Sequence, residues 1–229
     1  MEIEKKEFKP LYLEICGLPW IYSAHHQWLV GQALARRIAG YFCMNDAKYG
    51  TSVSIAKQRN DLIKQGLKTD ATHFVFVDWD VIPPVDAIQR LFRHNKDIIG
   101  GVYYSKDEFD RPLVFKNNKD IEIAPDSWRQ ENYIAYQGKG LEKVNLISAG
   151  LSLVRREVYE KMLEIPEIKE FGWYHHQTNK YTEDVYFCQL AERAGYEIWC
   201  DFDLIAEHLG VFSNRDIKLK DNKEFINKL

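Results

Sequence analysis

Two aspartates one residue apart, Asp78 and Asp80, are the side chains of this sequence whose types and spacing point most directly to chemistry. The β-branched and aromatic residues at 75–77 predict a short buried strand, and Pro83 and Pro84 interrupt the chain soon after it. Two carboxylates held close together repel unless a cation joins them. Oxygen ligands suit Mg²⁺ or Mn²⁺, which complete their coordination with water and phosphate oxygens. The pair therefore predicts a divalent-metal site with a nucleotide diphosphate as a natural partner.

The elements before this pair would place it at the edge of a sheet. Strands are predicted at 11–17 and 41–44 and up to Asp78, with amphipathic helices at 27–38 and 55–67 between them. This alternation is typical of crossover connections and a parallel sheet. Ligands bind such sheets at the carboxyl ends of the strands. The aspartates stand where a site is expected.

The rest of the chain predicts more strands and helices around two less regular segments. Residues 105–140 are polar and predict loops and short hairpins, and residues 170–181 predict a long loop of the kind that covers a site. Thr182 is a good N-cap for a helix whose first turn holds Glu183 and Asp184. Further elements are predicted as a helix at 85–94, a strand at 97–104, two strands and a helix over 144–162, and a strand at 196–201.

Length and composition limit the class of protein. A chain of 229 residues with a net charge of −3 can bury a substantial core and shows no basic field for nucleic acid. No apolar run approaches the roughly 18 residues that span a bilayer, and the first ten residues lack the apolar segment of a secretory signal. The scattered Cys16, Cys43, Cys188 and Cys200 predict reduced, buried side chains. A cytoplasmic protein is expected, with attachment to a membrane surface left open.

A phosphohydrolase of the haloacid dehalogenase type is a rival interpretation of the same Asp-x-Asp. Those proteins favour D-x-D-x-[TV], but Ile82 stands at the last position, and the pair follows two predicted strand–helix units rather than the first strand. No later acidic cluster after a lysine is present. The rest of the chain does not support this rival.

The ordered motifs resemble a known family. They are Arg59-Asn60, "VFVDWDVIPP", "GGVYY", "ISAGLSLVRREVYEKM", "TEDVYFCQLAERAGYEIWCD" and "HLG", spread over residues 11–212. This set resembles the glycosyltransferases of the GT-A fold, particularly the inverting family 2 type. The resemblance implies a single α/β domain over 1–229, Rossmann-like, with a central mostly parallel sheet flanked by helices. Its nucleotide-binding part would cover 11–104, its acceptor-side part 105–212, and a charged tail 213–229.

The resemblance also implies roles for particular residues. Asp80 would bind Mn²⁺ or Mg²⁺ directly, Asp78 would face the donor ribose or reach the metal through water, and His208 would add a metal ligand. Arg59 would contact the donor, with a surface arginine as the alternative, and Gly150 would let a sugar approach the backbone. The remaining two positions form an acidic pair at the acceptor site: Asp184 as general base, and Glu183 as an acceptor-orienting or structural group, with the reverse assignment open.

These roles fit one reaction. A divalent ion neutralises a departing diphosphate, and a carboxylate within hydrogen-bond reach takes the proton of the acceptor hydroxyl. The predicted activity is sugar transfer from a nucleotide-diphosphate sugar, UDP- or GDP-linked, to a carbohydrate, lipid-linked or protein acceptor, with inversion favoured. The alternatives are the phosphohydrolase and a non-catalytic nucleotide- or carbohydrate-binding domain of the same fold. The sugar and the oligomeric state stay open.

Overall fold

The computed structural model describes residues 8–16, 27–29, 31–32, 40–45, 55–106, 111–117, 132–177 and 180–209. Of the helix predicted at 27–38, residues 27–29 and 31–32 are helical, and the others lie outside the described residues. The charged tail 213–229 also lies outside them.

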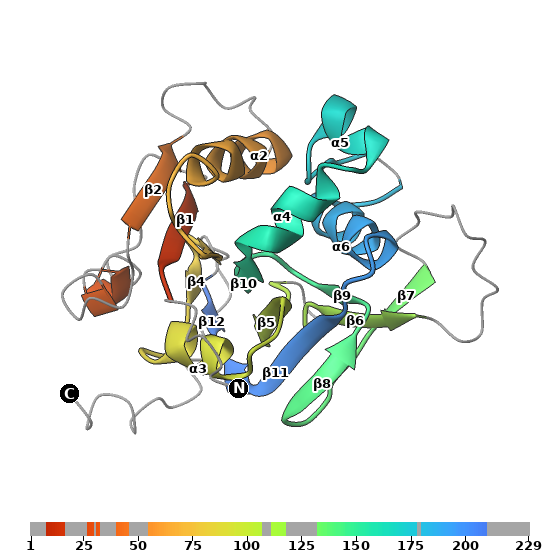
Figure 1. The fold of residues 1–229 in the computed structure, drawn as a ribbon. Coiled ribbons are helices and arrows are strands. Elements are labelled where there is room, and N and C mark those ends of the chain that lie inside the picture. The colour runs from red at the N-terminus through yellow and green to blue at the C-terminus, as the bar shows by residue number, and fades with distance from the viewer. Residues whose placement is uncertain are drawn as a thin grey trace, which may run out of the picture.

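A central sheet of seven strands runs in the order β2-β1-β3-β10-β5-β11-β8 (Figure 1). Its strands, in that order, are Gly40–Asn45, Pro10–Cys16, His73–Asp78, Leu151–Arg155, Ile98–Val102, Ile198–Ile205 and Leu141–Val144. β1 pairs in parallel with β2 and β3, and β11 with β5, whereas β10 and β8 run antiparallel to their neighbours. Five strands thus point one way and two the other, so the sheet is mainly parallel, as predicted.

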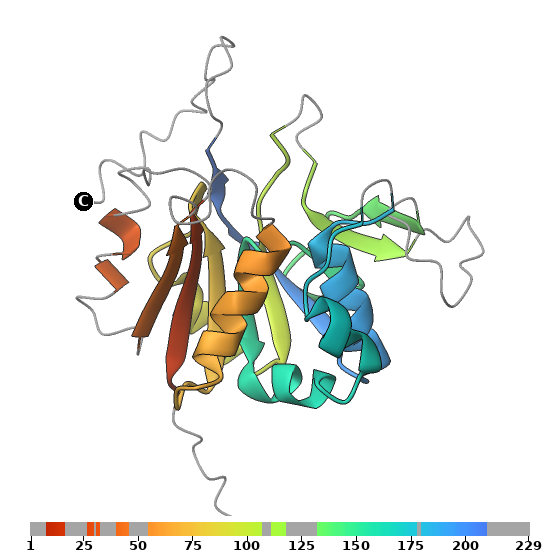
Figure 2. The same cartoon turned by 90° about the horizontal axis from the view of Figure 1, so that it is seen from above.

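Helices cover both faces of this sheet. Four of them, α2 (Ile55–Gly66), α4 (Arg156–Met162), α5 (Pro166–Phe171) and α6 (Glu183–Arg193), lie on one face, and α3 (Ala87–Arg93) lies on the other (Figure 2). Strand β3 shows why both faces are filled. Phe74 and Phe76 pack under α2 and α4, while Val75 and Val77 pack under α3, because successive side chains of a strand point to opposite faces. A strand buried on both faces is a continuous apolar run.

The two parts predicted on either side of residue 104 share this sheet. Strand β10, from the second part, lies between β3 and β5 of the first part and is antiparallel to both. Because β10 runs in reverse, its first residues meet the last residues of β3, with Leu151 opposite Val77. This reversal brings the preceding glycine turn to the end of β3.

Two small sheets complete the described fold. β4 (Val81–Ile82) pairs antiparallel with β12 (Glu207–His208), and β6 pairs with β7 and β9. The bounds of the last three are Val114–Asn117, Tyr133–Ala135 and Leu146–Ile147. The segment 105–140, predicted to hold loops and short hairpins, contains the antiparallel pair β6–β7, whose strands are separated by residues 118–132. Residues 107–110 and 118–131 of this segment lie outside the described part.

The segment predicted as a loop at 170–181 differs from that prediction at its start. Helix α5 continues to Phe171, and both Trp173 and Tyr174 are buried. Asn60 secures this stretch, because its side-chain amide donates to the Tyr174 carbonyl at 2.8 Å and accepts from the Tyr174 amide at 3.0 Å. The buried aromatic residues therefore pack as core, while Phe171 is 38% exposed.

No helix in the described part of the chain is long and apolar enough to cross a membrane. Cys188 and Cys200 are buried free thiols, in agreement with the sequence. The side chains of Cys16 and Cys43 lie outside the described set.

Candidate functional site

The residues singled out in the sequence meet at the edge of the sheet where β3 ends. Asp78 is the last residue of β3, and its backbone amide donates to the Gly150 carbonyl at 3.0 Å. The β4–β12 pairing sets His208 opposite Val81, next to Asp80. The first turn of α6 supplies Glu183 and Asp184. Four separate chain segments therefore converge on one edge.

Asp80 lies among cationic and polar partners. Lys106 Nζ donates to Asp80 Oδ2 at 2.5 Å, and His208 Nε2 lies 3.8 Å from the same oxygen. Burial alone would raise the pKa of this carboxyl, but His208 and Lys106 outweigh burial and lower the pKa below its ordinary value. Asp80 is held as a carboxylate that attracts cations.

The orientation of His208 determines which ring nitrogen faces Asp80. Nδ1 lies 2.6 Å from the Tyr104 carbonyl oxygen, which can only accept a hydrogen bond. Nδ1 must therefore carry a proton. The hydrogen bond from His208 that lowers the pKa of Asp80 needs a second proton, on Nε2, whereas in a neutral ring Nε2 presents its lone pair on the side of Asp80. The Tyr103 ring packs edge-on against the imidazole with its centroid 4.9 Å away. The imidazole is thus fixed in a direction suited to metal coordination.

Arg59 lies inside the protein, which excludes the surface-arginine alternative. Its side chain is 2% exposed, and its guanidinium lies over the rings of Phe76 and Tyr174 at 5.5 and 5.6 Å. Nη2 lies 3.2 Å from Asp78 Oδ1 and 3.8 Å from Glu183 Oε1. Burial alone would lower the pKa of Arg59. The charges of the surrounding carboxylates raise it by more than burial lowers it, so the pKa lies above its ordinary value and the residue stays charged.

Asp78 differs from Asp80 in its surroundings. Burial raises the pKa of Asp78, Arg59 opposes this rise, and the charges of Asp80 and Asp184 add to it. The Asp78 carboxyl is turned toward Arg59, whereas the Asp80 carboxyl is turned toward Lys106 and His208. Within the described residues, no group of three His, Cys, Asp or Glu side chains lies close enough together to hold a metal ion.

The position of Gly150 has no room for a larger residue. A Cβ atom placed there would lie 2.7 Å from Asp78 Oδ2 and closer still to the Tyr103 hydroxyl. The Gly150 amide instead donates to that hydroxyl at 3.1 Å. The glycine allows the backbone to pass directly beside the carboxyl of Asp78.

Asp184 ends a chain of hydrogen bonds that starts at this turn. The Tyr103 hydroxyl donates to Ser148 Oγ at 2.6 Å, and Ser148 Oγ donates to Asp184 Oδ2 at 2.8 Å. The other oxygen, Oδ1, is buried and has no hydrogen-bond partner in the described part of the chain. One oxygen is fixed and the other is left to accept a proton or a hydrogen bond.

The surroundings of Asp184 keep its affinity for a proton high. Burial, followed by the charge of Glu183, raises its pKa to about 6, although Arg59, Ser148 and the Ala149 backbone oppose the rise. A carboxyl with this pKa exchanges a proton near neutral pH, as a general base must.

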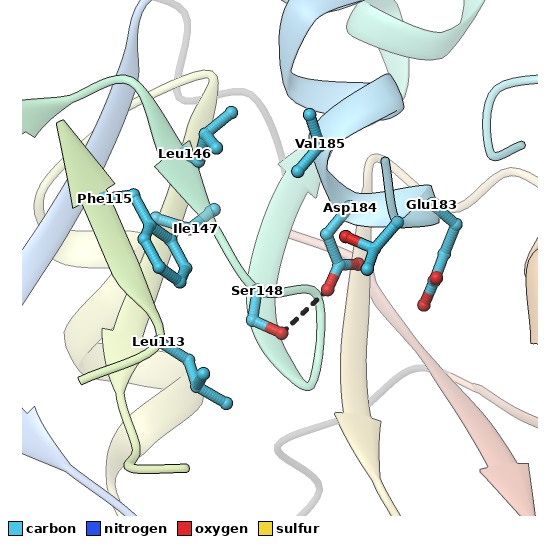
Figure 3. Close-up of a pocket in the computed structure, with 9 residues that line it drawn as sticks. Leu113, Phe115, Leu146, Ile147, Ser148, Glu183, Asp184 and Val185 are labelled. Atoms are coloured by element: carbon cyan, nitrogen blue, oxygen red, sulfur yellow. Dashed lines mark hydrogen bonds between the residues drawn. The ribbon is translucent and has the colours of Figure 1, made fainter. Parts of the chain in front are cut away.

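The start of α6 explains why two adjacent carboxylates differ. Thr182 occupies the N-cap position, but its side chain makes no capping hydrogen bond, so the expected cap is absent. Consecutive helical residues point about 100° apart. Accordingly, Asp184 points toward Ser148, whereas Glu183 points away from it (Figure 3). Glu183 instead lies on the side of Arg59.

A cavity of about 170 Å³ adjoins Asp184. Its apolar side includes Leu113, Phe115, Leu146, Ile147 and Val185, and its polar side Ser148, Thr182, Glu183 and Asp184. The hydrogen-bonded pair Ser148 and Asp184 lies at the edge of this cavity (Figure 3). A small molecule in this cavity would contact the carboxylate.

Three contributors were not assigned roles from the sequence. Tyr103 and Ser148 lie within the motifs "GGVYY" and "ISAG", so their neighbourhood was identified but not their hydrogen bonds. Lys106 stands in a polar segment without a pattern. Only the three-dimensional contacts identify these side chains.

The adjacent histidines His175 and His176 do not join the site. His175 is partly buried against Phe171, with ring centroids 4.5 Å apart, and burial lowers its pKa. His176 is exposed. Together they line a second cavity between α2 and residues 163–176, and His25 and His26 lie outside the described residues.

Comparisons with known proteins bear on the fold. No family profile and no curated protein matches this sequence. The crystal structure of A197 from STIV is similar, with 18% identity and a TM-score of 0.52, over 89% of this chain and 87% of that one. The crystal structure of GalNAc-T7 with UDP, GalNAc and Mn²⁺ is also similar, with 7% identity and a TM-score of 0.51, over 92% of this chain and 45% of that one.

At such identities the likeness concerns the fold alone, and the chain spans less than half of the GalNAc-T7 chain. Within that limit, this protein has a glycosyltransferase-like α/β fold.

Proposed function

We propose that this protein is a metal-dependent glycosyltransferase of the GT-A type. It would move a sugar from a nucleotide-diphosphate sugar to an acceptor hydroxyl. The observation that carries the proposal is a pair of aspartates at one sheet edge in opposite surroundings: Asp80 beside cations, with a lowered pKa, and Asp184 in a cavity, with a raised one. The fold shared with GalNAc-T7 and the family 2 resemblance of the motifs support the same activity.

Asp80 and His208 would supply two ligands of a divalent ion, with water and phosphate oxygens as the others. His208 Nε2 and Asp80 Oδ2 are 3.8 Å apart, and two ligands about 2.1 Å from one ion lie roughly 3–4 Å from each other. Lys106 already places a positive charge on Asp80, so the site accepts cations. Asp80 and His208 would hold Mn²⁺ or Mg²⁺ directly, with Asp78 through water. The bound ion would act as a Lewis acid that neutralises the leaving diphosphate.

The donor would lie over the turn at Gly150. The Gly150 backbone itself is buried, but the Asp78 side chain beside it is 25% exposed and would face a ribose or sugar hydroxyl. Arg59 is too deeply buried for the direct donor contact implied by the resemblance. We assign it instead the positioning of Asp78, to which it donates at 3.2 and 3.3 Å.

Asp184 would take the proton of the acceptor. As the acceptor oxygen bonds to the anomeric carbon, its proton moves to Asp184 Oδ1, and the bond from that carbon to the diphosphate breaks. The electron pair of the broken bond leaves with the nucleoside diphosphate. Attack from the face opposite the leaving group inverts the anomeric centre. Ser148 keeps the carboxylate in place, and Glu183 stays near Arg59 as an orienting or structural group.

The nucleotide of the donor, the acceptor and the cellular location are proposed as broad classes. UDP and Mn²⁺ are the first pair to test, because GalNAc-T7 was crystallised with both, and GDP is the second nucleotide. The acceptor would be a carbohydrate, a lipid-linked group or a protein, and the enzyme would act in the cytoplasm or at a membrane surface.

A stabilisation assay tests this proposal. The melting temperature of the full chain is measured with UDP, GDP or inorganic phosphate, each with and without Mn²⁺. We expect a nucleoside diphosphate to raise the melting temperature only when the metal is present, because a ligand that binds the native state stabilises it. Stabilisation by phosphate but not by either nucleotide would contradict the proposal and favour the phosphohydrolase.

A further inference from the structure

The cavity beside Asp184 has a composition that bears on which acceptor it would take. Leu146, Ile147 and Val185 are buried at its base, with exposures of 2%, 3% and 4%. Leu113, just before β6, and Phe115, within β6, extend this apolar wall (Figure 3). The polar groups are gathered on the side of the first turn of α6. The cavity is therefore divided into an apolar part and one polar edge.

The polar edge has few hydrogen bonds left to offer. Ser148 Oγ donates its only proton to Asp184 and already accepts from Tyr103. Asp184 Oδ1 is buried and lacks a hydrogen-bond partner among the described residues, and Thr182 and Glu183 lie on the same edge. One hydroxyl group of a ligand would satisfy this oxygen. Hydroxyls on the side of the ring away from this edge would face the apolar wall.

This arrangement discriminates between a polyhydroxylated ring and an apolar one. A polar group buried without a partner loses the hydrogen bonds that it made with water. Apolar surface buried on the wall favours binding. A ring with a single hydroxyl gains from the wall and pairs its hydroxyl with Asp184, whereas a ring with many hydroxyls loses several hydrogen bonds to water.

The size of the cavity matches one such ring. A protein cavity of about 150 Å³ lined by aliphatic and aromatic residues accommodates benzene. At about 170 Å³, this cavity has room for a six-membered ring and one hydroxyl oxygen. A disaccharide would extend beyond it.

We infer that the acceptor is a small alcohol or phenol, or the end of a larger molecule, whose reacting hydroxyl is carried on an apolar ring or branched alkyl group that fills this cavity. This inference rests on the proposed function and narrows its acceptor class. The hydroxyl meets Asp184, and the apolar group contacts the wall formed by β6, β9 and α6.

Binding measurements on the full chain test the inference without requiring turnover. Ligand-observed NMR compares cyclohexanol with myo-inositol, which has the same carbon ring with a hydroxyl on every carbon. We expect cyclohexanol to bind at least about tenfold more tightly. Equal binding, or tighter binding of myo-inositol, would overturn the inference.

Two variants locate the bound ligand. Leu113→Trp places a larger side chain at the cavity wall and should weaken cyclohexanol binding at least about tenfold, whereas Leu163→Trp, an exposed leucine away from this cavity, should leave it unchanged. If Leu113→Trp fails to fold, Val185→Thr serves instead. Threonine has nearly the volume of valine but places a hydroxyl group on the wall, so the preference for cyclohexanol over myo-inositol should become smaller. Unaltered binding in whichever variant folds would overturn the inference.

The same samples separate this inference from the proposed function. The metal-dependent stabilisation by a nucleoside diphosphate tests the donor side and does not involve the cavity. A nucleotide response without any preference for cyclohexanol would overturn the acceptor class alone. Cyclohexanol bound in the cavity without a nucleotide response would support the apolar site and contradict the transferase.

Discussion

Asp80 and Asp184 are the same kind of residue at the same edge of one sheet, yet their surroundings differ. Asp80 accepts a hydrogen bond from the Lys106 ammonium and faces the His208 imidazole, and its pKa is lowered. Asp184 accepts a hydrogen bond from the neutral hydroxyl of Ser148, borders an apolar cavity, and has a pKa raised to about 6. The first is kept as an anion, and the second exchanges a proton near neutral pH.

This difference shows how one fold divides binding from proton transfer. The protonation of a carboxyl is set by burial, neighbouring charge and hydrogen bonding rather than by residue type. Arg59 moderates the contrast, because its buried charge acts on both Asp78 and Asp184 and limits how far their pKa values rise.

Replacing Asp184 should produce the largest effect. Asp184→Asn keeps the size of the side chain but cannot take up the acceptor proton, so the transfer rate should fall about 10²–10⁴-fold. Sugar transfer, or donor hydrolysis in the absence of an acceptor, provides the measurement. The matched control is Glu183→Gln on the neighbouring position. A loss confined to Glu183→Gln would reverse the roles of the two residues.

Removing the His208 imidazole should weaken metal binding at Asp80. His208→Ala takes away the nitrogen 3.8 Å from Asp80 Oδ2, and we expect the affinity for Mn²⁺ to fall at least about tenfold, since loss of even an outer-shell partner typically costs that much. Calorimetric titration of the full chain with Mn²⁺ measures this change. His176→Ala, at an exposed histidine outside the site, is the control. An unchanged titration in the His208 variant would remove it from the metal site.

The pH dependence should reveal the raised pKa of Asp184. Only its carboxylate form takes a proton, so kcat/KM should rise with pH up to about 6 and then level off, with about a tenfold loss for each pH unit below that value. The range from pH 5 to pH 7 extends roughly one unit on either side of this pKa. A flat profile of kcat/KM over that range would be inconsistent with Asp184 as the base.

The same pKa predicts a change in stability with a definite sign. The folded-state pKa of Asp184 lies above its ordinary value of 3.8, so its stabilising contribution is present below pH 3.8 and is lost as pH rises through about 6. Asp184→Asn removes a charge that is costly to bury, and should increase the free energy of unfolding at neutral pH by at most about 3 kcal/mol. Urea unfolding of both proteins at pH 4 and pH 7.5 measures this difference. An increase larger at pH 4 would contradict the assignment.

A smaller effect is expected at Lys106. Its ammonium group occupies Asp80 Oδ2, where a metal ion would bind. Lys106→Met should therefore strengthen Mn²⁺ binding by a few-fold, since a partly exposed ion pair contributes about 0–1 kcal/mol. The control is Lys143→Met, which removes an exposed pair with Glu197. Weaker Mn²⁺ binding in the Lys106 variant would contradict competition at Asp80.

Much of the fold was predictable because its elements carry local signals. The apolar run of β3 and the acidic first turn of α6 mark where each element places its carboxylates. Their convergence followed from the rule that ligands bind at the carboxyl ends of parallel strands. These features depend on spacing within a short segment.

The contacts that give each site residue its character were not predictable. The antiparallel insertion of β10 sets Gly150 against Asp78, and the β4–β12 pairing sets His208 beside Asp80. The burial of Arg59 depends on the rings of Phe76 and Tyr174, which are distant along the chain. Periodicity indicates which face of an element is buried but not which partner covers it.

The central claim is that Asp80 binds the donor through a metal while Asp184 performs the proton transfer. One paired measurement tests it: Mn²⁺-dependent binding of the nucleoside diphosphate and sugar transfer, both determined for Asp80→Asn and Asp184→Asn, with Asp86→Asn as an exposed control. We predict that Asp80→Asn loses nucleotide binding, whereas Asp184→Asn binds the nucleotide like the parent and loses transfer. Parent-like nucleotide binding in Asp80→Asn, or parent-like transfer in Asp184→Asn, would contradict this division of roles.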